Sequence, residues 1–210
     1  MCFSAQASFG AAAILTIIGI VALKKTFSKK RYEAIPFASV PMLFAMQQFV
    51  EGIVWIAATH PEYQHYLKPA AYGFLFFAFF LWPIWIPFSL YHVERNAMRK
   101  NLLAIALGIG ATVSTGLAYL AWLYGISSSI SCSHVAYAIN LPSVPHWWAL
   151  ACYLFATITP FFISTKRKAW FFGMLVIASV AATLWFYSVC FTSVWCFFAA
   201  LLSVAIFCYV

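Results

Sequence analysis

Long apolar stretches separated by short polar segments make up this chain, and their lengths predict the fold. A helix needs about 20 apolar residues to span a bilayer. Five such stretches cover residues 5–23, 35–58, 67–90, 102–124 and 146–164. Residues 169–210 contain no charged side chain. As one helix they would be about 63 Å long, twice a ~30 Å hydrocarbon core, so we expect two spans with a turn near 187–193.

The basic residues predict the orientation of these seven spans. Eleven of the twelve Lys and Arg residues fall in three clusters, which follow the first, third and fifth stretches. The clusters are Lys24, Lys25, Lys29, Lys30 and Arg31; Arg95, Arg99 and Lys100; and Lys166, Arg167 and Lys168. Short loops rich in Lys and Arg stay on the cytoplasmic side. We therefore expect the N-terminus outside and the C-terminus inside.

Composition supports this prediction. The chain is 65% hydrophobic and 8% charged, whereas a soluble domain carries roughly 25% charged residues. We predict one all-α, seven-helix transmembrane domain over residues 1–210, in the cell membrane of a bacterium, with the lipid bilayer as its partner. The net charge of +8 then marks topology and does not indicate a nucleic-acid partner. Residues 1–10 lack the positive n-region of a cleavable signal peptide, so we expect the first span to act as a signal-anchor.

One acidic residue lies inside a predicted span. Glu51 is in the second stretch, whereas the other three acidic residues fall between stretches. Helical spacing places Gln47, Gln48 and Trp55 near Glu51 on one face, in the outer half of the span. An intramembrane carboxylate is costly and therefore points to a functional site. The alternative is a carboxylate that joins neighbouring helices by hydrogen bonds.

Thiol and imidazole groups gather on the predicted outer side. The longest outer loop, 125–145, carries Cys132, His134 and Tyr137. Cys2 and Cys190 are predicted outside as well, with Cys196 slightly deeper. Three interpretations stay open. The groups can bind zinc or copper, Cys2, Cys132 and Cys190 can form a disulfide, or the cysteines can pack as small apolar residues.

Three segments carry a resemblance. They are the opening Met1-Cys2-Phe3-Ser4-Ala5, the Gln47-Gln48-x-x-Glu51-Gly52 segment and Ser193-Val194-Trp195-Cys196-Phe197-Phe198-Ala199-Ala200. Together they resemble a family of bacterial integral-membrane proteins of unknown function. The resemblance implies that both ends of the chain and the second span contribute to one site, which brings Ser193 into consideration. By topology alone the chain is similar to alkaline ceramidases, but Ser193-Val194-Trp195-Cys196 stands where those zinc hydrolases have paired His residues.

Two functional hypotheses follow, with a structural membrane subunit as a third. The first is a small polar or metal site that faces the extracytoplasmic side and can belong to a membrane-embedded enzyme. The second is a transporter or receptor in which Glu51 titrates. A small molecule or lipid is the expected substrate class in either case. The candidate catalytic residues are Glu51, Cys2 and His134; the candidate substrate contacts are Gln47, Gln48, Trp55, Tyr137 and Ser193; and the candidate metal ligands are Cys132, His134 and Cys196.

Overall fold

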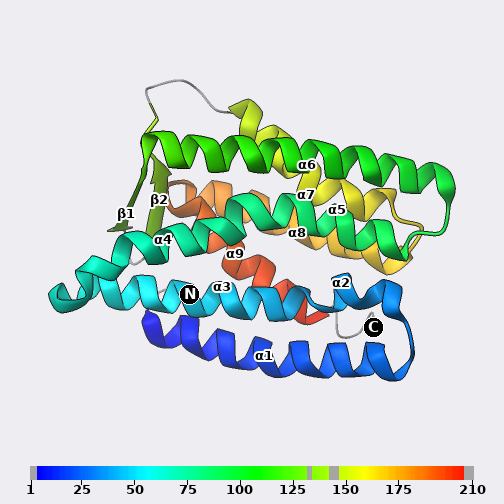
Figure 1. The fold of residues 1–210 in the computed structure, drawn as a ribbon, viewed down its shortest axis with the longest axis horizontal. Helices are drawn as coiled ribbons and strands as arrows, with labels where there is room; N and C mark the ends of the chain where they lie inside the picture. The colour runs from blue at the N-terminus through cyan, green and yellow to red at the C-terminus, as the bar shows by residue number, and fades with distance from the viewer. Residues whose placement is uncertain (1–3, 132–133, 142–146, 206–210) are drawn as a thin grey trace.

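The computed structural model describes residues 4–131, 134–141 and 147–205, and it is built mostly of helices (Figure 1). The helices are α1 (Ala5–Ser28), α2 (Ile35–Ala38), α3 (Val40–Thr59), α4 (Leu67–Leu75), α5 (Trp82–Val93), α6 (Ala97–Tyr124), α7 (Trp147–Ile163), α8 (Arg167–Phe186) and α9 (Phe191–Ser203). Short 3₁₀ turns are η1 (Tyr32–Ala34), η2 (Pro61–Tyr66) and η4 (Ser188–Cys190), and η3 (Phe76–Leu81) is a π-helix. The predicted predominance of helix is confirmed.

The helices match the predicted apolar stretches. Within the described residues, five helical segments are long and apolar enough to cross a membrane. They are Ala5–Ser28, Tyr32–Thr59, Pro61–Val93, Ala97–Tyr124 and Arg167–Phe186. Trp147–Ile163 and Ser188–Ser203 are apolar but shorter. The long charge-free stretch is interrupted where expected, because α8 ends at Phe186 and α9 begins at Phe191.

Close contacts hold α1 along α3. A Cβ added to Gly19 would lie 2.9 Å from the backbone nitrogen of Met42, and one added to Gly52 would lie 2.6 Å from the ring of Phe9. These glycines allow the two helices to approach closely, as small residues do in membrane bundles. Most of α1 remains at the edge of the bundle, below α3 in Figure 1. By contrast, α9 lies in the middle, where it contacts α3, α8 and the hairpin.

Pro83 and Pro87 shape the third helical segment. Neither proline has an N–H to give to the preceding turn, and Pro83 therefore leaves a carbonyl of the segment before it without its helical donor. The hydroxyl of Tyr153 donates to the carbonyl of Ala78 at 2.6 Å, and Ser114 Oγ donates to the carbonyl of Phe80 at 2.9 Å. The π-helix η3 carries both carbonyls. These bonds tie the segment to α6 and α7.

The prediction of an all-α fold needs one correction. Strands β1 (Ile126–Ser131) and β2 (His134–Ile139) form an antiparallel hairpin in the predicted outer loop, with Ile126 opposite Ile139. Gly125, at φ 74°, lies between α6 and β1 in a conformation that favours glycine. The physical reason for the hairpin is local. Apolar residues alternate along β2, which buries Val135 and Tyr137 on one face.

A carboxylate joins two of the connections at the opposite end. Glu94 is 2% exposed and accepts hydrogen bonds from the backbone nitrogens of Arg95 and Asn96. It also accepts from the backbone nitrogen of Thr165, at 2.7 Å, and from the Thr165 hydroxyl. Burial by itself raises the pKa of Glu94, but these hydrogen bonds outweigh it and lower the pKa below its ordinary value. The α5–α6 and α7–α8 connections are therefore held together.

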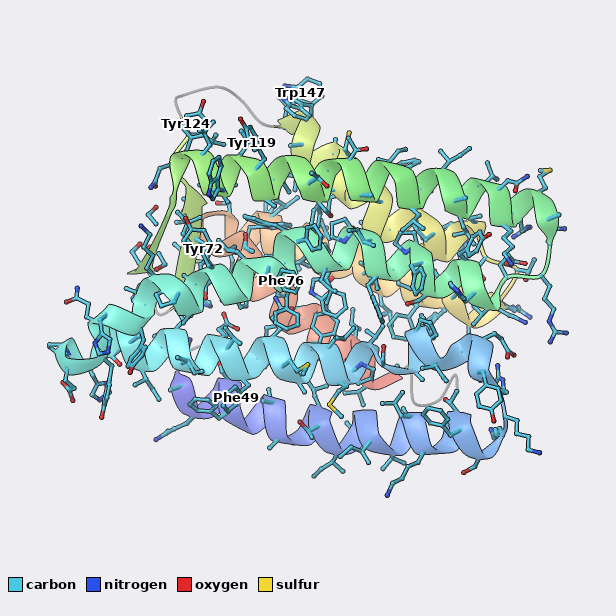
Figure 2. All side chains as sticks on the ribbon, viewed as in Figure 1. Phe49, Tyr72, Phe76, Tyr119, Tyr124 and Trp147 are labelled. Carbon is cyan, nitrogen blue, oxygen red and sulfur yellow. The ribbon has the colours of Figure 1, made fainter. Side chains whose placement is uncertain are left out.

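Exposed aromatic residues surround the hairpin end of the bundle. Tyr119 and Tyr124 project from the last turns of α6, and Trp147 projects from the beginning of α7 (Figure 2). All three are well exposed, and Trp147 is 72% exposed. Tyr and Trp are enriched where a membrane protein meets the head-group region.

Candidate functional site

Glu51 is completely buried, and its own helix provides the first partner. Gln48 lies three residues earlier on α3, so both side chains leave the same face. Gln48 Nε2 donates to Glu51 Oε2 at 3.1 Å. Glu51, Gln48 and Gln47 are all 0% exposed. The predicted polar face of α3 is therefore turned into the bundle, where buried polar groups require hydrogen-bonding partners.

The second partner comes from the other end of the chain. Ser193 is buried in the first turn of α9, and its Oγ donates to Glu51 Oε1 at 2.5 Å. Each oxygen of the buried carboxyl group therefore accepts a hydrogen bond, one from a hydroxyl and one from an amide. The two segments that carried the family resemblance in α3 and α9 thus meet at one hydrogen-bonded carboxyl group.

A third contact extends the cluster toward α5. Trp82 Nε1 donates to Gln47 Oε1 at 2.7 Å, and the Trp82 ring stacks on Phe44 with ring centroids 3.9 Å apart. On α9, Cys196 follows Ser193 by three residues, so both side chains leave the same face of the helix. We call Gln47, Gln48, Glu51, Ser193 and Cys196 the carboxylate cluster.

Two of the remaining candidates, Trp55 and Tyr137, belong to a hydrophobic core that also contains Cys196. Trp55 is 5% exposed and belongs to a core with Val54, Phe74 and Tyr137. Tyr137 stacks on Phe74 with 4.5 Å between ring centroids. The ring of His134 lies 4.9 Å from that of Tyr187. The hairpin therefore covers this core with aromatic packing.

The metal and disulfide hypotheses depend partly on Cys2 and Cys132, which lie outside the described residues. Among the residues that are described, no three His, Cys, Asp or Glu side chains form a group that could hold a metal ion. Cys190 is buried, and its Sγ donates to the carbonyl of Ser131 at 3.5 Å. It therefore contacts the residue that precedes Cys132 in the chain.

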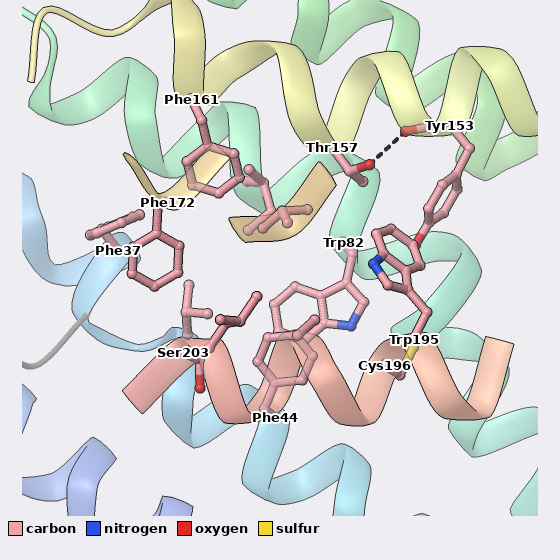
Figure 3. Close-up of a pocket in the computed structure, with 15 residues that line it drawn as sticks. Phe37, Phe44, Trp82, Tyr153, Thr157, Phe161, Phe172, Trp195, Cys196 and Ser203 are labelled. Atoms are coloured by element: carbon pink, nitrogen blue, oxygen red, sulfur yellow. Dashed lines mark hydrogen bonds between the residues drawn. The ribbon is translucent and has the colours of Figure 1, made fainter. Parts of the chain in front are cut away.

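Two apolar cavities adjoin the carboxylate cluster. The inner cavity, of about 60 Å³, lies between α9 and the facing helices and is lined by Phe44, Trp82 and Phe161 among others (Figure 3). The outer cavity, of about 250 Å³, extends toward β2 and α6. Tyr153, Trp195 and Cys196 line both cavities.

Comparison with known proteins places the chain in a family. The model of a family of unknown function, DUF6629, matches residues 1–210. The chain belongs to the DUF6629 family. No curated protein and no solved structure matches the chain. The predicted membership of a family of unknown function is confirmed.

Sequence reasoning missed three residues of this DUF6629 site. Trp82, Tyr153 and Trp195 line the inner cavity, but an aromatic residue in an apolar stretch carries no signal that separates a cavity wall from ordinary packing. A weak signal did exist for Trp82, because it precedes Pro83 in a segment whose hydrogen bonding the proline must disturb. Trp195 lies inside the segment that carried the resemblance.

Proposed function

We propose that this DUF6629 chain is a seven-span membrane protein with its N-terminus outside and its basic loops in the cytoplasm. The arrangement of its ends supports this topology. The second and third basic clusters flank connections that Glu94 and Thr165 join, and Arg99 Nη1 donates to the Ile163 carbonyl at 2.8 Å. The α1–α2 connection, which carries the first cluster, lies at the same end of the bundle in Figure 1. The exposed aromatic residues and the hairpin are at the opposite end.

The proposed function is binding of a small, mostly apolar molecule in the outer cavity, with Glu51 as the buried carboxyl group that acts on the site through its hydrogen bond to Ser193 on the cavity-lining helix α9. One observation carries the proposal. A fully buried carboxyl group, held by Ser193 and Gln48, is bonded to α9 one helical turn from the cavity-lining residue Cys196. Apolar cavities with a few convergent polar groups are the usual form of small-molecule sites. An intramembrane carboxyl group is usually functional.

The cavity walls favour a local pocket over a continuous polar route. The outer cavity is bounded by Phe79, Leu117, Ile139, Leu150 and Phe191 along most of its surface. Such walls hold apolar groups and do not stabilise a column of water. A membrane-embedded enzyme or binding protein therefore fits this geometry better than a channel does.

Cavity filling tests the proposal. Ala149 on α7 is buried and lines the outer cavity, whereas Ala151 on the same helix is exposed. Wild-type protein, Ala149→Phe and Ala151→Phe would be purified from the same membranes in the same detergent. Organic extracts would then be compared by mass spectrometry. We expect a molecule that is retained by the wild type and by Ala151→Phe and is lost from Ala149→Phe.

The role of Glu51 needs a second comparison. Glu51→Gln keeps the size of the side chain and an acceptor for Ser193, so we expect the variant to fold. We expect it to retain a different amount of the molecule than the wild type does. Retention of the same molecules by wild type, Ala149→Phe and Ala151→Phe would contradict a binding function for the outer cavity. If wild type and Glu51→Gln retain the same molecules in the same amounts, the carboxyl group has no role in the site.

A further inference from the structure

An open groove on the outside of the bundle leads to the outer cavity. It has a volume of about 510 Å³ and lies between α6 and α7. Gly108 and Gly116 form part of its floor, and a Cβ added to either residue would meet no atom within 4 Å. The groove lining runs from Ile105 to Leu120, which is about 22 Å along α6. These residues face lipid if α6 spans the membrane as proposed.

The groove and the outer cavity share two walls. Leu117 on α6 and Ala149 on α7 line both spaces. These shared walls lie toward the hairpin end of the groove, because Leu117 is near the end of α6 at Tyr124 and the hairpin follows. A molecule in the outer cavity can therefore extend an apolar chain past Leu117 into the groove. The chain would then run toward the middle of the bilayer, as the chains of an outer-leaflet lipid do.

A hydrogen-bond donor lies at the deep end of this path. Trp195 is 6% exposed and lines both cavities, and its Nε1 has no hydrogen-bond partner among the described residues. In Figure 3 the nitrogen edge of its ring faces the space enclosed by the lining side chains. A buried indole N–H usually has a partner, and leaving it unpaired costs about 1–3 kcal/mol. The donor therefore points to a ligand that carries an acceptor.

From these observations we propose that the ligand is a single-chain lipid amphiphile: an acyl or isoprenyl chain that ends in a small, uncharged hydrogen-bond acceptor such as a carbonyl. Its chain lies in the α6–α7 groove, and its acceptor binds Trp195 Nε1. The inner cavity, at about 60 Å³, has room only for a small head group. Among the described residues, neither cavity is lined by a Lys or Arg that could balance an anionic head. This inference rests on the proposed binding function.

A second copy of the chain is the competing occupant of the groove. Gly108, Thr112 and Gly116 are spaced four residues apart on the exposed face of α6, and such small residues also favour contact between membrane helices. Two observations favour the lipid. The groove continues into the outer cavity, which a straight helix could not fill, and Trp195 in the wall shared by the two cavities carries an unsatisfied donor.

A matched pair of probes tests the inference. Purified full-length protein in dodecyl maltoside would be titrated with 2-tridecanone or with tridecane, and an apparent Kd would be obtained from the rise in unfolding temperature. We expect wild type to bind the ketone about tenfold more tightly than the alkane, which corresponds to one hydrogen bond. Trp195→Phe keeps an aromatic ring without the N–H. It should bind the ketone about tenfold more weakly and leave alkane binding unchanged.

Two groove variants complete the test. Gly116→Leu fills the groove and should weaken both probes, whereas Ala118→Leu, on an exposed position of α6 outside the groove, should change neither. Equal ketone binding by wild type and Trp195→Phe would overturn the proposed head-group contact. A change of oligomeric state in Gly116→Leu, measured by native mass spectrometry, with unchanged probe binding would show a helix interface and overturn the proposed chain site. Either result leaves the cavity-filling test with Ala149→Phe unaffected.

Discussion

Ser193 and Glu51 are joined by a hydrogen bond through the centre of the bundle, although 142 positions separate them in the chain. Ser193 Oγ lies 2.5 Å from Glu51 Oε1 and is the donor. Both side chains are fully buried. The bond sets the position of α9 against α3, because a turn of α9 by one residue would carry Ser193 away from its acceptor. The same helix then presents Trp195 and Cys196 to the two cavities.

Loss of the Ser193 hydroxyl should destabilise the fold. Ser193→Ala leaves one oxygen of a buried carboxyl group without this donor, so we expect the free energy of unfolding to fall by about 2 kcal/mol. Ser203→Ala is the control, because Ser203 is equally buried on α9 but donates to the Ala200 carbonyl of its own helix. Unfolding in mixed micelles measures both.

The double variant Glu51→Gln/Ser193→Ala, compared with the two single variants, measures the interaction energy between the two side chains. For residues in direct contact we expect the two single effects to deviate from additivity by more than about 0.5 kcal/mol. Equal losses in Ser193→Ala and Ser203→Ala, together with additive effects in the double variant, would rule out a special Glu51–Ser193 interaction.

Gly110 and Gly108 should respond oppositely to the same substitution. A Cβ on Gly110 would lie 1.9 Å from the carbonyl oxygen of Pro83, so Gly110→Ala must push α6 away from α5. We expect a loss of about 2 kcal/mol, as for other overpacked sites. Gly108→Ala meets open space and should lose nothing, because Ala favours a helix by up to about 1 kcal/mol over Gly. Thermal unfolding of both variants would show the difference, and a larger loss in Gly108→Ala would contradict the α5–α6 packing.

Glu94 should give the protein an acid-sensitive component of stability. Its pKa is lower in the folded protein than the value of about 4.3 expected when unfolded. The stabilisation is therefore complete above that unfolded value and disappears as the pH falls through the lower, folded pKa. At pH 7, Glu94→Gln should cost about 2 kcal/mol, because a neutral amide replaces a carboxylate that several donors contact.

The exposed Glu33 provides the control for Glu94. Glu33→Gln should leave unfolding unchanged at both pH values. The difference between wild type and Glu94→Gln should shrink when unfolding is measured near pH 3. A difference that stays constant from pH 7 to pH 3 would mean that Glu94 does not ionise more readily in the folded state.

Cysteine labelling in intact cells should support the proposed topology. In a background with the native cysteines replaced by serine, Asn140→Cys in the outer connection should react with a membrane-impermeant maleimide. Lys29→Cys and Lys166→Cys should react only after the cells are opened. The expectation rests on the partition of eleven basic residues to one side and one to the other. Labelling of Lys166→Cys from outside would contradict the proposed orientation.

The helical framework could be predicted from the sequence because its causes are local. A run of about 20 apolar residues without charges favours a helix wherever lipid is the solvent, and each basic cluster marks the end of such a run. The break after Phe186 followed from length alone. The hairpin was missed, although Val135, Tyr137 and Ile139 alternate with less buried neighbours, because a run of six residues is too short for periodicity to decide.

Glu51 was also identified from the sequence, since a single carboxyl group within an apolar stretch stands out whatever it contacts. Its surroundings were decided only by tertiary structure. Ser193 donates to Glu51 and Trp82 donates to the neighbouring Gln47, from helices that no spacing rule relates to α3. The burial of Glu94 likewise depends on Thr165, 71 positions away, so a residue that reads as a loop charge becomes a connector between loops. Hydropathy and charge are properties of segments and can be read along the chain, whereas hydrogen-bond partners and cavities depend on how whole helices pack.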